Sequence, residues 1–378
     1  MKKDLINILA KLISFKSITP IDDGCQLYIG NYLENLGFTI NKKKYGEVDN
    51  LIAHRGSTKP VVAFLGHTDV VPVGDVKQWS NDPFKLTKNN GKFIARGVAD
   101  MKGSIACMLL AIKNFIKKNP NHNGTIVMIL TSDEEGPAIN GVQKLIQNNV
   151  LQEYGIDMCL IGEPTSRTTL GDTIKNGRRG SLSGKILIKG QQGHIAYPQN
   201  AINPIHQVSP IISELITKKY DEGNEFFPPT SFQISNIHSG IGVDNVIPNE
   251  LIFKFNFRYS PKSTKEALIS SVEQALTNSG VSYEIEWHHS GDPYLTSKRE
   301  LLDICSETID EILSIRPNIS TDGGTSDGRF LAKICNQVIE FGLLNESIHK
   351  INENVKEEDL IVLSEIYERL LSKLFDAH

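Results

Sequence analysis

Three short runs of almost unbroken apolar residues constrain the fold of this chain more than any other feature. They occupy residues 61–65, 126–130 and 158–161. Strands buried on both faces of a parallel sheet have this composition, whereas strands with one wet face alternate apolar and polar residues. Residues 102–118 lie between the first two runs and carry apolar side chains at helical spacing, which predicts a crossover helix. We therefore predict an α/β fold with a mostly parallel sheet that helices cover on both faces.

The middle of the chain follows a different pattern. Between residues 181 and 288 the sequence predicts a strand, a helix, two strands, a helix and a strand, the βαββαβ order of a ferredoxin-like unit. The α/β pattern then resumes with a strand at 338–341 and a final helix from Val355. A chain of 378 residues is also longer than one hydrophobic core usually organises. We predict one domain formed by residues 1–179 and 294–378, interrupted by an inserted ferredoxin-like domain at 180–293.

Net charge, hydropathy and cysteine spacing limit what this protein can bind and where it can reside. The formal net charge is −4 and charges of both signs are mixed along the chain, which gives no footprint for nucleic acid or an anionic membrane. No stretch reaches the roughly 18 to 20 apolar residues of a membrane span, and the first residues are typical of an amphipathic helix rather than a signal peptide. The cysteines are scattered without a Cys-x-x-Cys pair, which argues against disulfides and thiolate zinc sites. We expect a cytoplasmic protein with a small-molecule site.

Imidazoles and carboxylates follow the predicted strands, at the ends where open α/β sheets bind ligands. GHTDVVP follows the first apolar run, TSDEEG the second, GEPTS the third and GLLNESIHK the strand at 338–341, while RGVADMKG precedes the crossover helix. The ionisable residues of interest in these segments are His67, Asp69, Asp100, Asp133, Glu134, Glu135, Glu163 and His349. We expect these loops to converge at one edge of the sheet.

A metal centre is the simplest account of such a convergence. Carboxylates gathered at one point repel one another, and each is driven toward protonation unless cations neutralise it. Histidine and carboxylate ligands without cysteine favour zinc in a catalytic site that keeps positions open for water. Two histidines and three carboxylates suffice for two ions if one carboxylate bridges. A solvated loop end or a helix cap is the alternative for any single residue, but the whole set favours metal.

Six segments carry a resemblance to a known family. GHTDVVP, WSNDPF, GVADMKG, SDEEGP, GEPTS and IHKINE resemble the zinc aminoacylase and carboxypeptidase family, whose members cleave amide bonds with a dinuclear centre. The segments occur in the family's order and span essentially the whole chain. The resemblance implies that Asp100 bridges two zinc ions, that His67 and Glu163 complete one site, and that Glu135 and His349 complete the other. Cobalt is expected to substitute for zinc.

The same resemblance implies further roles. Glu134 is implied as the general base that takes a proton from water and passes it to the leaving nitrogen, and Asp69 as the partner that orients His67. In relatives the inserted domain mediates dimerisation. His194, in GHIAYP of that domain, is implied to reach the active site of the partner subunit of a homodimer and to stabilise the oxyanion there.

Four segments resemble one branch of the family more closely: GDTIKNGRRGS, GHIAYP, GGTSDGRF and GLLNESIHKINE. That branch hydrolyses N-succinyl-LL-diaminopimelate to succinate and LL-diaminopimelate in lysine and cell-wall precursor synthesis. The substrate carries several carboxylates, so arginines are expected to bind it. The implied substrate contacts are Arg178, Arg258, Ser181, Tyr197, Asn245, Thr325 and Asn345. Asp244 stands where relatives often carry a second asparagine, and Ser347 replaces a common threonine; the first departure leaves the contacts of its loop open.

Two alternatives remain at this point. An acetylornithine deacetylase would have a similar fold and metal site, but it lacks the GRRGS and GGTSDGR segments in this form. A metal-bound binding protein that has lost catalysis is the alternative outside the enzymes. Retention of Glu134 and of every implied ligand argues against it.

Overall fold

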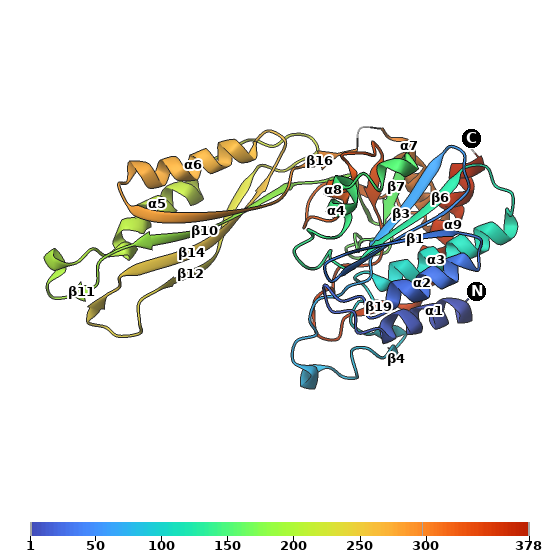
Figure 1. Cartoon of the computed structure of the whole chain (residues 1–378), viewed down its shortest axis with the longest axis horizontal. Helices are drawn as coiled ribbons and strands as arrows, with labels where there is room; N and C mark the ends of the chain where they lie inside the picture. The colour runs from blue at the N-terminus through green and yellow to red at the C-terminus, as the bar shows by residue number, and fades with distance from the viewer. Residues whose placement is uncertain (1, 297, 377–378) are drawn as a thin grey trace. The chain divides into compact units, whose positions relative to one another are not determined.

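The computed structural model describes residues 2–296 and 298–376, and the chain divides into two compact units (Figure 1). The first unit comprises Met1–Gly177, Leu295–Ser320 and Ser326–His378. The second comprises Arg178–Tyr294 together with the short segment Thr321–Thr325. No helix among the described residues is long and apolar enough to span a membrane.

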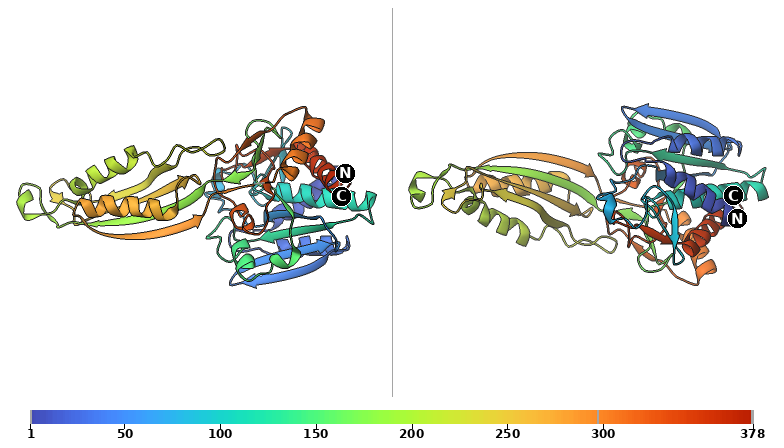
Figure 2. Two further views of the ribbon diagram at one scale, coloured as in Figure 1. Left: turned by 90° about the horizontal axis from the view of Figure 1, so that it is seen from above. Right: turned by 90° about the horizontal axis from the view of Figure 1, so that it is seen from below.

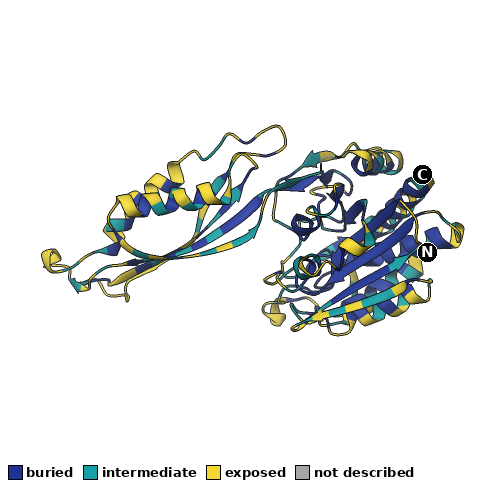
Figure 3. Cartoon of the chain, turned by 45° about the horizontal axis from the view of Figure 1, so that its top comes forward, coloured by how far each residue is buried: buried dark blue, intermediate teal, exposed yellow. Residues whose placement is uncertain are grey.

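The first unit is built on a sheet with the strand order β1-β2-β6-β3-β7-β18-β8-β17. The strands are β1 (Thr39–Tyr45), β2 (Val48–Arg55), β3 (Val61–His67), β6 (Thr125–Thr131), β7 (Met158–Ile161), β8 (Thr173–Lys175), β17 (Asn318–Ser320) and β18 (Val338–Glu340). The central strands β6, β3, β7 and β18 run parallel, while β1 and β2 form an antiparallel hairpin at one edge. Every residue of β3, β6 and β7 is buried, as their apolar sequences predict (Figure 3). The predicted mostly parallel α/β sheet is therefore confirmed.

Helices on one face of this sheet share a single hydrophobic core with alternate residues of the strands. They are α1 (Lys2–Ser14), α2 (Cys25–Glu34), α3 (Lys102–Lys118), α7 (Glu300–Leu313) and α9 (Glu357–Asp376). The short helices α4 (Val142–Gln147) and α8 (Gly328–Leu331) contact each other on the other side of the sheet. The crossover helix has the predicted bounds. The final helix was predicted from Val355, which was wrong, because Asn354–Lys356 form a strand, β19, that pairs with β5 (Lys92–Ile94).

The second unit has the predicted ferredoxin-like order. It runs β10 (Gly180–Lys189), α5 (Pro204–Thr217), β12 (Ser231–Ser239), β14 (Glu250–Tyr259), α6 (Lys265–Asn278) and β15 (Ser282–Gly291). The strands form an antiparallel sheet in the order β12-β14-β10-β15, and α5 and α6 cover one of its faces (Figure 2). Alternate aromatic residues of β14, Phe253, Phe255 and Phe257, point into the core beneath the helices. A small hairpin sheet pairs β11 (Gly193–His194) with β13 (Val246–Ile247).

Candidate metal centre

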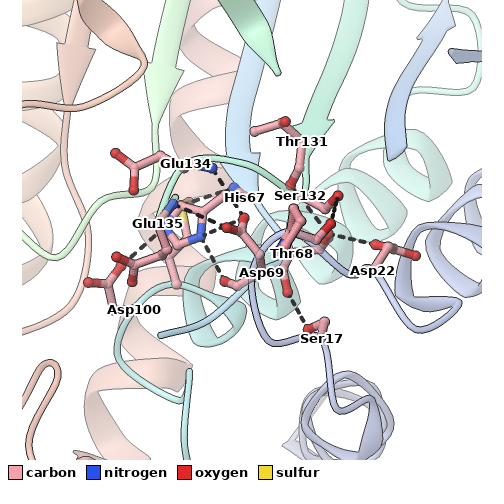
Figure 4. A network of polar contacts seen from close by, with 12 residues as sticks. Ser17, Asp22, His67, Thr68, Asp69, Asp100, Thr131, Ser132, Glu134 and Glu135 are labelled. Atoms are coloured by element: carbon pink, nitrogen blue, oxygen red, sulfur yellow. Dashed lines mark hydrogen bonds and ion pairs between the residues drawn. The ribbon is translucent and has the colours of Figure 1, made fainter. Parts of the chain in front are cut away.

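Ligand-type residues reach one edge of the first sheet from different segments. His67 is the last residue of β3, Glu134 and Glu135 stand on the turn after β6, and Glu163 follows β7. These strands are parallel neighbours, so their carboxyl ends meet at the same edge. Asp100 joins them from the loop before α3. Figure 4 shows the side chains of His67, Asp100, Glu134 and Glu135 gathered there.

The Asp100 carboxylate lies between two imidazoles. Its Oδ1 is 3.2 Å from Nε2 of His67, and its Oδ2 is 3.3 Å from Nε2 of His349. Each imidazole has a second carboxylate beside it: Oε1 of Glu163 lies 3.8 Å from Nε2 of His67, and Oε1 of Glu135 lies 3.0 Å from Nε2 of His349. The atoms therefore divide into two donor sets that share Asp100.

The pKa shifts of the clustered side chains indicate whether this site would accept cations. Burial raises the pKa of Glu134 well above its ordinary value, and the neighbouring Glu163 raises it further. Burial opposes ionisation of Asp100, but hydrogen bonds from His349 and His67 outweigh it and hold the pKa of Asp100 below its usual range. The hydrogen bond to Asp100 is the main cause that raises the pKa of His349 to about 10. The carboxylates thus require nearby positive charge, and divalent cations with nitrogen and oxygen ligands can supply it.

Asp69 organises the centre through both its backbone and its side chain. Its carbonyl oxygen is 2.9 Å from Nδ1 of His67, so Nδ1 carries the proton and Nε2 faces the other ligands. The Asp69 carboxylate lies 3.6 Å from the same ring nitrogen. It also accepts the backbone N–H groups of Glu135, at 3.1 Å, and Glu134, at 3.4 Å. One residue therefore orients an imidazole and the turn that carries two neighbouring carboxylates.

Glu134 and Glu135 have different surroundings although they are adjacent. Figure 4 shows their carboxylates pointing apart. Glu135 contacts His349, whereas ligand atoms of Glu134, His67 and Glu163 lie within 4.8 Å of one another. Glu134 therefore borders the donor set of His67 and Glu163 without sharing the contact to His349, which is a suitable place for a proton acceptor.

His194 belongs to the second unit, on β11, where its side chain is exposed. Its Nδ1 accepts the N–H of Ala196 at 3.1 Å, and its ring lies 5.7 Å from the ring of Tyr197. Asn245 is close by along the small sheet, because its carbonyl accepts the N–H of Ile195 at 3.1 Å. His194, Tyr197 and Asn245 are thus brought together within this unit.

The two arginines implied in substrate binding also belong to the second unit. Arg258 on β14 is paired in register with Ser181 on β10. The Ser181 hydroxyl accepts a hydrogen bond from Asn256 at 3.0 Å. Arg178 is 7% exposed and donates to the carbonyl of Asp322 at 3.0 Å. Arg258 therefore lies on β14 opposite the start of β10, and Arg178 lies just before β10 in the chain.

Thr325 ends the segment Thr321–Thr325 of the second unit, whereas Asn345 belongs to the first, where its N–H donates to the carbonyl of Ser166 at 2.9 Å.

Sequence reasoning gave no role to two buried carboxyl groups near the centre. Burial raises the pKa of Asp327 to about 7, and Asp327 in turn raises the pKa of Glu134. Glu353 accepts the backbone N–H of Asp100 at 3.1 Å. Asp327 lies in GGTSDGRF and Glu353 in IHKINE, two segments that carry the family resemblance. Their presence in these segments is the sequence signal that could have indicated a role near the centre.

Comparisons with known proteins identify the family and the fold. The sequence matches Peptidase family M20/M25/M40 over residues 63–373. A succinyl-diaminopimelate desuccinylase of Thiobacillus denitrificans is 50% identical over 374 residues, which cover 99% of this chain and 95% of that protein. In structure the chain resembles an M20 family metallo-carboxypeptidase from Sulfolobus solfataricus, with a TM-score of 0.87, 20% identity and coverage of 99% and 100% of the two chains. It also resembles a dinuclear metal-binding peptidase of the M20 family from Bacillus subtilis, with a TM-score of 0.74, 17% identity and coverage of 100% and 99%.

Proposed function

Because the chain belongs to peptidase family M20/M25/M40, we propose that it hydrolyses the amide bond of N-succinyl-LL-diaminopimelate and releases succinate and LL-diaminopimelate. Membership makes it a metal-dependent hydrolase of amide bonds. The observation that carries the reaction type is the Asp100 carboxylate, whose two oxygens face two different histidines. The substrate is supported by the similarity to the Thiobacillus denitrificans desuccinylase over nearly the whole chain. The reaction belongs to lysine and diaminopimelate biosynthesis, and we place it in the cytoplasm.

We propose two zinc ions per chain, with cobalt as a substitute. His67 and Glu163 would hold one ion, Glu135 and His349 the other, and Asp100 both. The donor set supports this assignment, because it combines imidazole and carboxylate groups without a thiolate. When bound, the ions supply Lewis acidity at the scissile carbonyl and positive charge beside the developing oxyanion.

The protein's own groups perform the proton transfers. Glu134 accepts a proton from the attacking water as the oxygen–carbon bond forms, and delivers it to the amide nitrogen as the carbon–nitrogen bond breaks. Its place beside the donor set of His67 and Glu163 supports this role. Asp69 assists indirectly, because it fixes the turn that carries Glu134 and the tautomer of His67.

We propose a homodimer formed by the second unit, in which His194 stabilises the oxyanion in the partner subunit's site. Strand β12 lies at an edge of its sheet, and an exposed edge strand can pair with another chain. Apolar side chains are exposed around β12, α5 and the β11 hairpin. They are Ile195, Tyr197, Ile202, Ile205, Ile216, Ile237, Ile241 and Val243.

Substrate carboxylates require cationic partners, and we propose Arg178 and Arg258 for this role. Ser181, Tyr197, Asn245, Thr325 and Asn345 would add hydrogen bonds. The position of both arginines within the second unit, with Arg258 next to Ser181, supports a common anion-binding role.

Turnover distinguishes this function from its alternatives. The zinc-loaded protein is incubated in parallel with N-succinyl-LL-diaminopimelate and with acetylornithine, and succinate and acetate are quantified. Release of succinate at a kcat/KM at least 10-fold above that for acetylornithine is expected. Preference for acetylornithine would replace the proposed substrate, and bound metal without turnover of either compound would identify a binding protein.

A further inference from the structure

Glu353 makes an unusual set of contacts four positions after His349. Its side chain is 1% exposed, and within the described part of the chain its carboxylate accepts hydrogen bonds from backbone N–H groups and from Arg96. Oε1 accepts the backbone N–H groups of Ala99, at 2.8 Å, and Asp100, at 3.1 Å. Oε2 accepts the N–H of Gly97, at 3.0 Å, and a guanidinium N–H of Arg96, at 2.8 Å. The carboxylate thus fastens the loop that carries Asp100.

Arg96 holds Glu353 from the other side. The Arg96 side chain is 2% exposed, and its Nη1 also donates to the carbonyl of Lys350 at 3.2 Å. Its guanidinium lies 5.1 Å from the centre of the Trp79 ring. Trp79 in turn donates from Nε1 to the carbonyl of Val73 at 2.8 Å. The WSNDPF segment therefore packs against the ion pair, although it carries none of the proposed metal ligands.

The backbone of this loop is shaped to meet the carboxylate. Gly97 has a φ of +79°, and a Cβ there would lie 2.6 Å from a side-chain carbon of Val70, so only glycine fits. With this conformation the N–H groups of residues 97, 99 and 100 all point at one side chain. Such arrays of backbone N–H groups bind anions, and here the anion is supplied by the chain itself.

We propose that Glu353 is a positioning residue that couples the segment of His349 to the loop of Asp100, an inference that rests on the proposed metal centre. Asp100 must present Oδ2 to His349 and Oδ1 to His67 at the same time. The N–H of Asp100 is fixed by Glu353, and Glu353 lies on the same short segment as His349. Glu353 therefore sets the separation between the bridging carboxylate and the second histidine.

The substitution Glu353→Gln isolates this role. The amide has the same shape as the carboxylate. Its NH₂ group, however, would face N–H donors that in the native protein donate to a carboxylate oxygen of Glu353. A buried donor left without an acceptor is destabilising. The ligand side chains themselves are unchanged. A partner that orients metal ligands from outside the ligand set typically contributes about 10-fold to 100-fold in metal affinity or activity, so a loss of that size is expected in affinity for at least one ion.

The test uses cobalt binding, a readout independent of turnover. Metal-free native protein, Glu353→Gln, Arg96→Lys and a control are titrated with cobalt ions, and stoichiometry, affinity and the visible absorption spectrum are recorded. The control is Asp221→Asn, because Asp221 also accepts backbone N–H groups, from Gly223 at 2.7 Å and Thr230 at 3.1 Å, but in the second unit. Circular dichroism and thermal unfolding report whether each variant is folded.

Glu353→Gln is expected to show weaker cobalt binding and an altered spectrum, while Asp221→Asn matches the native protein in both. Folded Glu353→Gln with native affinity and a native spectrum would overturn the inference. If Glu353→Gln does not fold, Arg96→Lys decides, because an ammonium cannot keep the contacts to Glu353 and Lys350 together in the geometry of a guanidinium; native cobalt binding in that variant would equally overturn it. Absence of cobalt binding by the native protein would reject the proposed metal centre itself, a result distinct from both.

Discussion

The substitution Glu134→Gln tests the proposed mechanism most directly, because it removes a proton acceptor and little else. The amide keeps the shape of the side chain. The backbone N–H groups of residues 134 and 135 still donate to Asp69, so the turn and the proposed ligand Glu135 keep their positions. We therefore expect the folded state and the metal content to survive the change.

The expected loss of turnover follows from what surrounds Glu134. General acid–base catalysis typically contributes about 10²-fold to 10⁴-fold. Two neighbouring carboxylates, Glu135 and Glu163, are each beside a histidine of the proposed centre and would be engaged as ligands. As ligands these two carboxylates could not replace Glu134 as proton acceptor, so the upper part of the range is expected, about 10³-fold to 10⁴-fold, or about 4 to 5.4 kcal/mol in activation free energy.

The assay is succinate release under substrate saturation, with metal content measured on the same samples. Glu311→Gln is the matched control, because it makes the same chemical change in the first unit, on α7, where Glu311 pairs with Lys373 at 2.6 Å. The control should keep native kcat and metal content. Turnover within 10-fold of native in Glu134→Gln, with two ions bound, would refute the assignment and move the base elsewhere, with Asp327 the next residue to test.

Three further predictions concern the metals, the dimer and the substrate. A chelator should abolish activity and added zinc or cobalt should restore it, whereas full activity in protein shown to be metal-free would exclude the dinuclear mechanism. His194→Ala and Glu134→Gln, each inactive alone, should regain activity when refolded together, because mixed dimers contain one intact site; no recovery despite demonstrated heterodimers would reject the shared site. Arg178→Ala should lower kcat/KM for the succinylated substrate by about 10²-fold or more, since an unpaired buried carboxylate is strongly unfavourable, while an acetylated analogue should be little affected. Equal losses on both substrates would make Arg178 structural.

The central strands could be predicted from sequence because burial on both faces leaves a local signal. Residues 61–65, 126–130 and 158–161 are apolar without interruption, and the structure has strands at each. The hairpin β1–β2 was not predicted. Its outer strand reads TINKKKY, and lysines that protect a sheet edge from further pairing erase the apolar signal. The three-residue strand β19 lies where the sequence predicts the start of the final helix, because its pairing partner, β5, lies far away in sequence and leaves no local signal.

The candidate site likewise has one part that the sequence predicts and one part that it does not. That ligand-type residues follow the strands is a property of topology, and parallel strands place them at one edge whatever the side-chain details. Which atoms meet depends on geometry that no local pattern encodes. The sequence suggests Asp69 as the partner of His67, but the contact at 2.9 Å is made by the Asp69 carbonyl, while its carboxylate accepts N–H groups from another loop.

Loops are generally the more mobile parts of a fold, and most of the proposed metal ligands stand on loops. Here two buried carboxylates act against that mobility. Asp69 accepts the N–H groups of Glu134 and Glu135, and Glu353 accepts those of the loop that ends at Asp100. In both cases an acid outside the proposed ligand set fixes the backbone of residues inside it. The charge of Glu353 is balanced by Arg96 at 2.8 Å, whereas the Asp69 carboxylate adds negative charge beside His67 and so increases the need for cations at that place.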